Sequence, residues 1–225
     1  MPGEVDGLPF CELSAKTQTE FESISCVIPY PDGAMLFAEG QTPRGVFILR
    51  KGRVKLSICS ADGKTLILRI AEPGEVLGLA GTLSGRYYEM TAETIGPCDI
   101  EYVKRESFLR FMQTHNEVCL WVAEQLSYMY NTACREIRSL GLSHSAAEKL
   151  AKLLLDWSLG TGDRRQPGRI KLSLTHEEVA QMIGTSRETV TRLFADFKRR
   201  QFIQLNGSTL LIRNKASLEA MAHAS

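Results

Sequence analysis

Residues 175–197 read THEEVAQMIGTSRETVTRLFADF, and this stretch decides the expected fold of the C-terminal part of the chain. Thr175 can cap the start of a helix, and Glu178, three residues later, can return the hydrogen bond in a capping box. Gly184 stands where the chain must turn sharply, because glycine tolerates a positive φ. A cap, an amphipathic segment, a turn glycine and a second amphipathic segment together predict a helix-turn-helix.

The second helix of this pair is predicted to begin at Thr185 or Ser186 and to have an apolar and a polar side. Its apolar side carries Val190, Leu193, Phe194 and Phe197. Its polar side carries Arg187, Glu188, Thr191 and Arg192. In the major groove of DNA, arginine can donate two hydrogen bonds to guanine and glutamate can accept one from cytosine. The pattern therefore favours a DNA-reading helix over an ordinary helix pair with a solvated charged face.

A β-hairpin is predicted directly behind the helix pair. Residues 202–205 and 209–212 are rich in strand formers, and Asn206-Gly207 between them predicts a type I′ turn. A short hairpin in this place is a wing, so we expect a winged helix. Basic residues between helix and hairpin suit contacts with phosphate, although a solvated basic helix end explains them equally well. These residues are Lys198, Arg199 and Arg200.

The charge of the chain is unevenly distributed. The net charge of all 225 residues is +1, but residues 142–225 carry 13 Lys and Arg against 8 Asp and Glu, and residues 1–141 carry 14 against 18. An acidic front and a basic back favour a regulatory domain joined to a nucleic-acid-binding one. No run approaches 18 apolar residues and no signal pattern opens the chain, so we expect no membrane partner and a cytoplasmic location.

The front of the chain is expected to form a β jelly roll. Strand formers cluster in residues 34–37, 45–49, 53–58, 65–70 and 91–103, and glycines stand between the clusters. Residues 73–81 are predicted to interrupt these strands with a short turn of helix. Short strands at this spacing, without helices between them, are typical of a sandwich or a jelly roll.

A long helix is predicted to follow, from Glu106 or Asn116 to Leu140. Apolar residues recur along it at steps of three and four, which is typical of a coiled coil. We interpret this stripe as a dimer interface, and the alternative is a helix packed on its own β domain. The stripe consists of Cys119, Val122, Leu126, Met129, Ala133, Ile137 and Leu140.

These elements predict three parts of the chain. Residues 1–115 form a β-roll sensor domain, residues 116–141 a dimerisation helix and residues 142–225 a winged helix-turn-helix domain. A second capping box, Ser145 with Glu148, opens the last domain. The hinge between helix and DNA-binding domain is placed at Gly141–Ser145.

The order of β roll, short glycine-flanked helix, long helix and winged helix resembles the Crp/Fnr family of bacterial transcription regulators. The most specific stretch is GTSRETVTR at 184–192. The resemblance implies an α+β fold with an N-terminal cyclic-nucleotide-binding-like jelly roll, a homodimer, and a palindromic DNA site with TGTGA-like half-sites. It also implies RNA polymerase as a partner. By the same resemblance Arg187, Glu188 and Arg192 would read bases, and Thr175 and Ser186 would contact phosphates.

The resemblance places the effector pocket at Gly78, Leu79, Arg86, Tyr87, Ala133 and Cys134. Relatives that bind cyclic AMP have glutamate where Leu79 stands, serine where Tyr87 stands, and a Thr-Ser pair where Ala133-Cys134 stands. Each nucleotide group left unpaired costs about 1–3 kcal/mol, so we expect no cyclic AMP binding. Arg86 could still hold an anion. The effector is therefore an unidentified small ligand, or there is none.

Cysteines and histidines do not predict a metal centre. The six cysteines are scattered without a CxxC pair and are expected to be reduced, small buried residues. An iron–sulfur cluster would need more than Cys11, Cys26 and Cys98 at these spacings, and haem would need a histidine that the β roll lacks. His115 is predicted to be an exposed helix-end residue. Thiol sensing through Cys134 or Cys98 stays an alternative.

Enzymatic activity is not expected either. Catalytic jelly rolls gather histidines and carboxylates around a metal, and no phosphate-binding loop or nucleophile motif occurs in this sequence. We predict a sequence-specific DNA-binding regulator. The alternatives are a regulator gated by a cyclic nucleotide and a protein-binding adaptor built on a winged helix.

Overall fold

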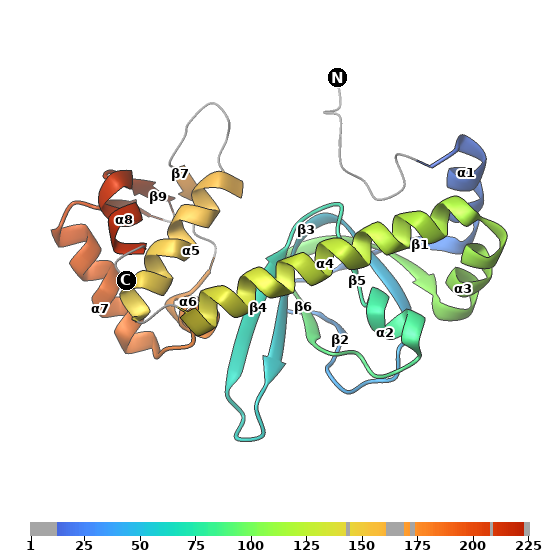
Figure 1. Ribbon diagram of the computed structural model, residues 1–225, viewed down its shortest axis with the longest axis horizontal. Helices are drawn as coiled ribbons and strands as arrows, with labels where there is room; N and C mark the ends of the chain where they lie inside the picture. Colours follow the sequence, from blue (N-terminus) through green and yellow to red (C-terminus); the bar gives the residue numbers. More distant parts are fainter. Residues whose placement is uncertain (1–12, 143–144, 161–168, 172–173, 208, 223–225) are drawn as a thin grey trace. The chain divides into compact units, whose positions relative to one another are not determined.

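The computed structural model describes residues 13–142, 145–160, 169–171, 174–207 and 209–222. The chain divides into two compact units, residues 1–132 and residues 133–225 (Figure 1). The boundary falls inside one long helix, so the first part of the helix predicted for dimerisation belongs to the N-terminal unit. The predicted hinge Gly141–Ser145 includes residues 143 and 144, which lie outside the described residues.

The N-terminal unit is built on one antiparallel sheet. Its strands follow the order β1-β6-β3-β4, while β2 also pairs with β6 and β5 with β3. This is the β-roll arrangement expected from the glycine-separated strand formers. The bounds are β1 Ser25–Tyr30, β2 Met35–Phe37, β3 Gly45–Cys59, β4 Thr65–Ala71, β5 Val76–Leu77 and β6 Thr91–Lys104.

Strand β3 is one strand of 15 residues, where the sequence predicted two. Gly52 lies in the middle with φ +93°, and the register with β6 shifts on both sides of Lys51. A Cβ atom on Gly52 would lie 2.5 Å from Cys98 Sγ and 2.7 Å from the Pro97 carbonyl oxygen. Gly52 therefore marks a bulge within a continuous strand, which bends the sheet without ending it.

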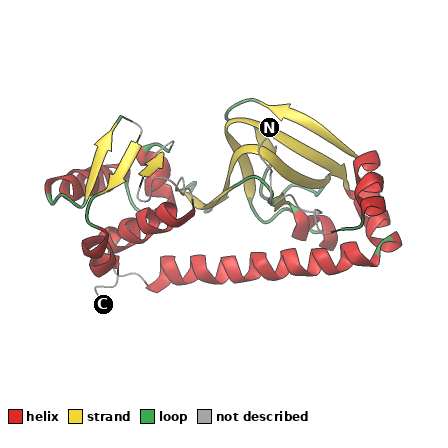
Figure 2. Ribbon diagram, turned by 90° about the horizontal axis from the view of Figure 1, so that it is seen from above, coloured by secondary structure: helices red, strands yellow, loops and turns green. Residues whose placement is uncertain are grey.

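Two hydrophobic clusters hold the N-terminal unit together. One lies within the roll and is rich in aromatic residues, among them Phe37, Phe47 and Tyr88. The other lies between the roll and the helices that pack along it, and it includes Val46, Ile48 and Trp121 (Figure 2). Alternate residues of β3 serve the two clusters, because successive side chains of a strand point to opposite faces.

Four helices accompany the roll: α1 Ala15–Ile24, α2 Leu79–Ser84, α3 Arg105–Thr114 and α4 Asn116–Leu142. A short helix was predicted within residues 73–81; strand β5 lies in that range, and α2 begins only at Leu79. Helix α1 was not predicted from the sequence. The two candidate starts of the long helix turn out to belong to two helices, because α3 ends at Thr114 and α4 begins at Asn116.

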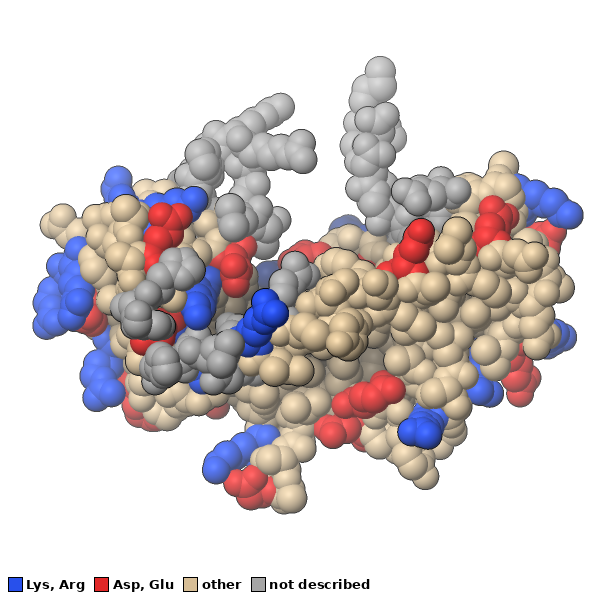
Figure 3. Space-filling model, viewed as in Figure 1, with Lys and Arg blue, Asp and Glu red and all other residues tan. Residues whose placement is uncertain are grey.

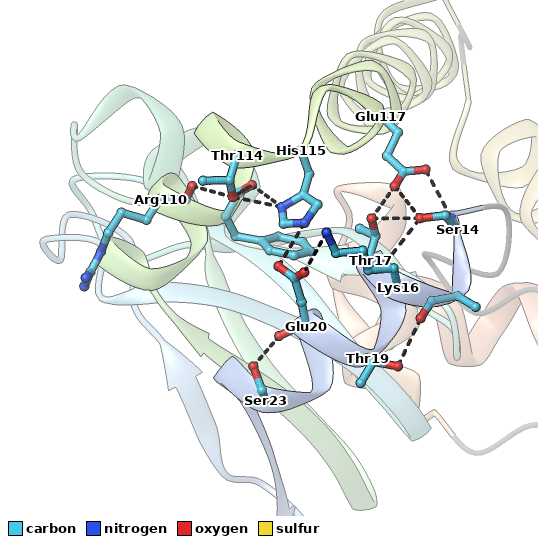
Figure 4. A network of polar contacts seen from close by, with 12 residues as sticks. Ser14, Lys16, Thr17, Thr19, Glu20, Ser23, Arg110, Thr114, His115 and Glu117 are labelled. Atoms are coloured by element: carbon cyan, nitrogen blue, oxygen red, sulfur yellow. Dashed lines mark hydrogen bonds and ion pairs between the residues drawn. The ribbon is translucent and has the colours of Figure 1, made fainter.

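A network of polar contacts joins α1 to the junction of α3 and α4 (Figure 4). Glu117 of α4 accepts hydrogen bonds from the Ser14 amide at 3.1 Å, from the Ser14 hydroxyl at 2.8 Å and from the Thr17 hydroxyl. These bonds, led by that of Thr17, lower the pKa of the Glu117 carboxyl. Its carboxylate thereby lies at the start of α1, where a helix favours negative charge.

His115 is part of the same network, and the prediction of an exposed helix-end residue was wrong. Its side chain is only 12% exposed, and Nε2 lies 3.0 Å from Glu20 Oε2. Nδ1 lies 3.0 Å from the Phe111 carbonyl oxygen, and the imidazole packs against the Phe111 ring. His115 therefore connects α1 to the α3–α4 junction, a contact between distant segments that helix periodicity does not show.

The residues of the predicted apolar stripe of α4 do not all face the same way: some pack against the roll and others face solvent. Val122 is 4% exposed and packs in the cluster under the roll, and the half-buried Leu126 and Met129 pack against that cluster. Val122 therefore belongs to the core of its own chain, and its assignment as a dimer contact was wrong. This is the alternative in which the helix packs on its own β domain. Leu140 lies where the structure describes no side chains.

A second stripe of α4 remains on the outside. It steps by four, three, four, three and four residues. Four of its residues also belong to the predicted stripe: Cys119, Leu126, Ala133 and Ile137. Tyr130 is 71% and Ile137 70% exposed, while Leu126 is half-buried. The stripe consists of Cys119, Ala123, Leu126, Tyr130, Ala133 and Ile137. We call it the outer stripe.

The C-terminal unit packs its helices and a small sheet around one core. The elements that follow α4 are α5 Ala146–Gly160, β7 Arg169–Lys171, α6 His176–Ile183, α7 Arg187–Arg199, β8 Ile203–Asn206, β9 Thr209–Ile212 and α8 Lys215–Ala222. Ser145 and Glu148 form the predicted contact at the start of α5. The core comes from α5, α6, α7, the wing strands and α8, and Trp157 packs against it. The winged helix is confirmed.

The turn of the wing is shifted by one residue from the prediction. Asn206 is the last residue of β8 and pairs with Thr209, so the chain reverses after it. Gly207 has φ +59°, but among the described non-glycine residues a positive φ occurs at Gln201 and not at Asn206. Asn206-Gly207 is therefore not the pair of central turn residues, because strand pairing extends one residue further than the propensities indicate.

Candidate DNA-binding surface and effector region

The first helix of the helix-turn-helix is fixed at both ends. The Glu178 amide donates to Thr175 Oγ1 at 3.2 Å, and the Thr175 amide donates to Glu178 Oε2 at 2.8 Å. This is the predicted capping box. At the other end Gly184 has φ +64°, and its amide donates to the Ala180 carbonyl. The turn between the helices therefore uses the left-handed region that favours glycine.

The second helix, α7, begins at Arg187 with Ser186 as its N-cap. The Thr189 amide donates to Ser186 Oγ at 3.2 Å. Hydrogen bonds from its own amide and from the Ser186 hydroxyl lower the pKa of the Glu188 carboxyl. Glu188 is therefore an ionised acceptor at the end of the helix that favours negative charge.

One side of α7 is anchored in the core of the unit. Val190, Phe194 and Phe197 are each at most 2% exposed, and Leu193 packs against the same cluster. The opposite side is open to solvent. The structure brings together there four of the residues predicted to contact DNA: Arg187, Glu188, Thr191 and Arg192.

The basic residues of α7 differ in whether a carboxylate neutralises them. Among the described residues, no ion pair engages Arg187, Arg192 or Lys198. Arg199, in contrast, pairs with Asp196, which also accepts from Arg200 Nε at 2.9 Å. Figure 3 shows Lys and Arg side chains gathered on the side of the C-terminal unit where α7 lies. Two residues at the end of α7 were predicted to contact phosphate. Lys198 has no ion pair among the described residues, whereas the charge of Arg199 is paired with that of Asp196.

Two polar residues of the helix-turn-helix and the wing were not predicted. His176, the first residue of α6, lies with Nδ1 2.9 Å from Thr191 Oγ1 on α7. Arg213 follows the wing strand β9 and donates from Nε to Gln204 Oε1 at 2.8 Å. Its basic side chain adds to the charge at the base of the wing. The contact of His176 with Thr191 joins two helices. The sequence shows only that a polar residue stands at each of the two positions.

The candidate effector region centres on α2. Gly78 precedes this helix with φ +73°, and Leu79 is fully buried among Val46, Ile48 and the helices α3 and α4. Leu79 is therefore a core residue that has no access to a solute. The Thr82 hydroxyl donates to the Gly45 carbonyl at 2.7 Å, which ties α2 to the start of β3.

Tyr88 covers the glycines of α2. It is 2% exposed, and its ring stacks on Phe37 with centroids 4.1 Å apart. Its hydroxyl donates to the Gly45 carbonyl at 2.8 Å and accepts from the Arg44 and Gly45 amides at 3.0 and 3.2 Å. A Cβ on Gly78 would lie 2.8 Å from the Tyr88 ring. The space in front of these glycines is therefore occupied by the chain itself.

The six predicted pocket residues do not form one site within either unit. Arg86 is exposed and Tyr87 is 65% exposed, whereas Leu79 is buried. Ala133 and Cys134 belong to the C-terminal unit. A cyclic nucleotide needs an acceptor for its ribose hydroxyl and donors for its phosphate. Leu79 supplies no acceptor, and the hydroxyl of the neighbouring Tyr88 is bonded within the chain, whereas Arg86 presents an exposed donor.

The thiols also differ from the expectation of small buried residues. Cys26, Cys59 and Cys119 are exposed, Cys134 is intermediate and Cys98 is buried. Burial raises the pKa of the Cys98 thiol, which donates to the Arg53 carbonyl at 3.2 Å. Such a thiol is a poor nucleophile, so Cys98 does not suit redox sensing. Cys11 lies outside the described residues.

In the part of the chain that the structure describes, no group of three or more His, Cys, Asp or Glu side chains could hold a metal ion. None of the described helices combines the length and the apolar character that crossing a bilayer requires.

Two domain families match the chain. Residues 27–115 match the cyclic nucleotide-binding domain and residues 148–221 the Crp-like helix-turn-helix domain. The second match contains α6, α7 and both wing strands. The order of the two matches agrees with the order of the two units.

Similar proteins match over most of the length of the chain. The transcriptional activatory protein AadR of Rhodopseudomonas palustris is 28% identical over 226 residues, covering 98% of this chain and 91% of AadR. The cAMP-activated global transcriptional regulator CRP of Pasteurella multocida is 24% identical over 184 residues, covering 81% and 88%. The structure of FixK2 from Bradyrhizobium japonicum has a TM-score of 0.76 at 22% identity, covering 90% and 99%.

Proposed function

This chain belongs to the Crp/Fnr family of DNA-binding transcription regulators, and we propose that it reads a palindromic DNA site as a homodimer. Members of this family are regulators and not enzymes. The observation that carries the proposal is the exposed side of α7. Its first two turns combine arginines without an ion pair among the described residues with the ionised Glu188, on a helix whose other side is buried.

We propose that this side of α7 enters the major groove. Arg187 and Arg192 then donate to guanine and Glu188 accepts from cytosine, which suits half-sites resembling TGTGA. Thr175 and Ser186 stand at the N-termini of the two helices, where amides and hydroxyls favour a phosphate. Lys198, more than two turns further along α7, supplies a further phosphate contact.

The outer stripe of α4 is the proposed dimer interface. Its alternating steps of four and three are those of a left-handed coiled coil, and it leaves Tyr130 and Ile137 exposed in the single chain. A second copy of the same stripe, related by a two-fold axis, buries both side chains and doubles the number of reading helices. A two-fold dimer matches a palindrome whose half-sites lie one DNA turn apart.

We further propose that DNA binding needs no cyclic nucleotide. Leu79 and Tyr88 support this, because the first is a core residue and the second fills the space before α2. The relative from P. multocida is named as cAMP-activated, so the two chains would differ in control while sharing a DNA-binding mode. RNA polymerase is the proposed protein partner of the DNA-bound dimer, and the signal is an unidentified ligand or none.

Fluorescence anisotropy tests the reading of DNA. A labelled TGTGA-N6-TCACA duplex and, separately, a labelled scrambled duplex are titrated with the purified protein at fixed salt, with and without cyclic AMP. We expect selective binding that cyclic AMP does not change. Equal binding to both duplexes under both conditions would contradict sequence-specific reading of this site. Selective binding only with cyclic AMP would contradict the proposed independence from nucleotide.

Sedimentation equilibrium tests the dimer with two matched variants of α4. Ile137→Asn changes the outer stripe, and Leu120→Asn changes an aliphatic residue that is 65% exposed but lies off the stripe. Loss of two buried isoleucines should weaken the dimer by at least about tenfold, whereas Leu120→Asn should leave it nearly unchanged. Equal effects of the two variants would show that another surface joins the copies.

A further inference from the structure

His176 holds a residue of the DNA-reading helix in place. Its imidazole stacks on the buried Phe194 ring, with centroids 5.0 Å apart and an angle of 12° between the planes. Its Nδ1 lies 2.9 Å from Thr191 Oγ1. Stacking fixes the plane of the imidazole, and the bond to Thr191 selects the orientation in which Nδ1 faces α7.

The Thr191 hydroxyl is bonded on both sides. It donates to the Arg187 carbonyl of the preceding turn at 3.0 Å. Since a hydroxyl has one proton, His176 Nδ1 must be the donor in the second bond. Threonine in a helix divides between two rotamers, and a bond to a carbonyl one turn back selects one of them. The contact with His176 reinforces that choice from outside the helix.

The engaged hydroxyl leaves a methyl group as the free end of an exposed side chain. Thr191 lies one turn after Arg187, on the side of α7 that faces solvent. A hydroxyl can pair with any base, but a methyl group makes its favourable groove contact with the C5-methyl of thymine. The orientation of Thr191 therefore decides which kind of base edge it can recognise.

We propose that His176 is a positioning residue that turns the Thr191 hydroxyl inward, so that the Thr191 methyl contacts the C5-methyl of a thymine in each half-site. This inference rests on the proposed binding of DNA through α7. It adds a recognised base feature, a thymine methyl, and names the residue pair that selects it.

The test removes that single methyl group from the DNA. An operator is first selected by the full-length protein from a randomised duplex pool, and each thymine of its half-sites is then replaced in turn by deoxyuridine. One thymine of each half-site should matter. Its replacement in a single half-site should weaken binding about fourfold, since one methyl group is no longer buried. Replacement in both half-sites should weaken binding more than tenfold.

Protein variants identify the residues that sense this methyl. Thr191→Ser keeps the hydroxyl and loses the methyl, so it should bind thymine and deoxyuridine operators equally. His176→Phe keeps a ring on Phe194 and loses the donor, and it should reduce the preference to about twofold or less. His176→Asn restores a donor and should restore the preference. Thr189→Ser is the matched control on the same helix, and it should behave as the unchanged protein.

The outcomes separate this inference from the function on which it rests. Failure to select any operator would overturn both. A selected operator without a deoxyuridine effect would overturn the inference and leave DNA reading intact. A deoxyuridine effect that survives Thr191→Ser, or a full preference in His176→Phe, would assign the methyl contact or its positioning to other residues. Circular dichroism and binding to scrambled DNA verify that each variant is folded.

Discussion

Helices α7 and α2 are anchored in the cores of their units in similar ways but differ in what their remaining surface offers. Helix α7 buries Val190, Phe194 and Phe197 and leaves its charged first turns to solvent. Helix α2 buries Leu79, Gly81 and Thr82, and the Tyr88 ring covers its glycines. On α7 the charged side chains are exposed to solvent, whereas the hydroxyls of Thr82 and Tyr88 around α2 are bonded to the Gly45 carbonyl. The exposed side of α7 is therefore accessible to another molecule, whereas Leu79 and Tyr88 pack within their own unit.

The largest effect should come from removing the ring that fills the α2 region. Tyr88→Ala deletes a buried aromatic side chain and leaves the Arg44 and Gly45 amides without their acceptor, so the N-terminal unit should lose about 3–5 kcal/mol of stability. Denaturant unfolding followed by Trp121 fluorescence, in a Trp157→Phe background, measures this loss. Tyr88→Phe keeps the ring and should cost about 1–2 kcal/mol. Equal, small losses in both variants would show that the ring does not hold this region together.

A substitution on the exposed side of α7 should alter DNA binding and leave the stability of the C-terminal unit unchanged. Arg187→Ala should cost about 1–3 kcal/mol of binding to the preferred duplex and relax selectivity at one guanine, with an unchanged melting temperature. Anisotropy titrations against duplexes changed at each base pair measure this. Arg110→Ala, an exposed arginine of the N-terminal unit, is the control. A uniform loss on all sequences would instead make Arg187 a phosphate contact.

A smaller effect is expected where α7 ends. Gln201 has φ +58°, the Phe202 amide donates to the Phe197 carbonyl and the two phenylalanine rings are in contact, as in a Schellman motif. Because this position favours glycine, Gln201→Gly should stabilise the C-terminal unit by about 0.5–1 kcal/mol. Gln201→Ala keeps the Cβ and should bring no gain. Thermal unfolding of both variants decides whether backbone strain or the side chain matters.

The smallest effect concerns the pH dependence of the N-terminal unit. Bonds from Thr17 and Ser14 lower the pKa of Glu117, so its contribution is present above the pKa of the unfolded chain and is lost as pH falls through the folded pKa. The melting temperature should therefore drop between about pH 6 and about pH 3, and Glu117→Gln should reduce that drop. An unchanged slope in Glu117→Gln would assign the acid sensitivity to other carboxylates.

Local rules made the DNA-binding module predictable from the sequence. A capping box, a turn glycine and an apolar spacing of three and four act within a few residues, and the structure places Thr175, Gly184 and Ser186 as these rules require. The glycine-separated strands likewise indicated the roll. Gly52 was misjudged because a bulge and a turn both favour a positive φ, and only the partner strand distinguishes them.

The remaining differences arise from contacts between distant segments. Val122 and Ala123 are neighbours on α4, and the packing of the roll decides which of them faces inward. Helix α1 and the burial of His115 depend on each other, so neither shows in the sequence alone. The pocket residues were assigned by resemblance to the family. Whether Leu79 is buried depends on which side of α2 faces the core, and the resemblance does not show this.

The chain has two tryptophans, one in each unit: Trp121 is buried under the roll, and the half-buried Trp157 packs against the C-terminal cluster. Each unit therefore contains its own intrinsic fluorophore. Replacing one tryptophan at a time by phenylalanine would give two proteins whose emission reports the unfolding of one unit or the other. Whether a disturbance in the roll reaches the DNA-binding unit through α4 then becomes an optical measurement that needs no added label.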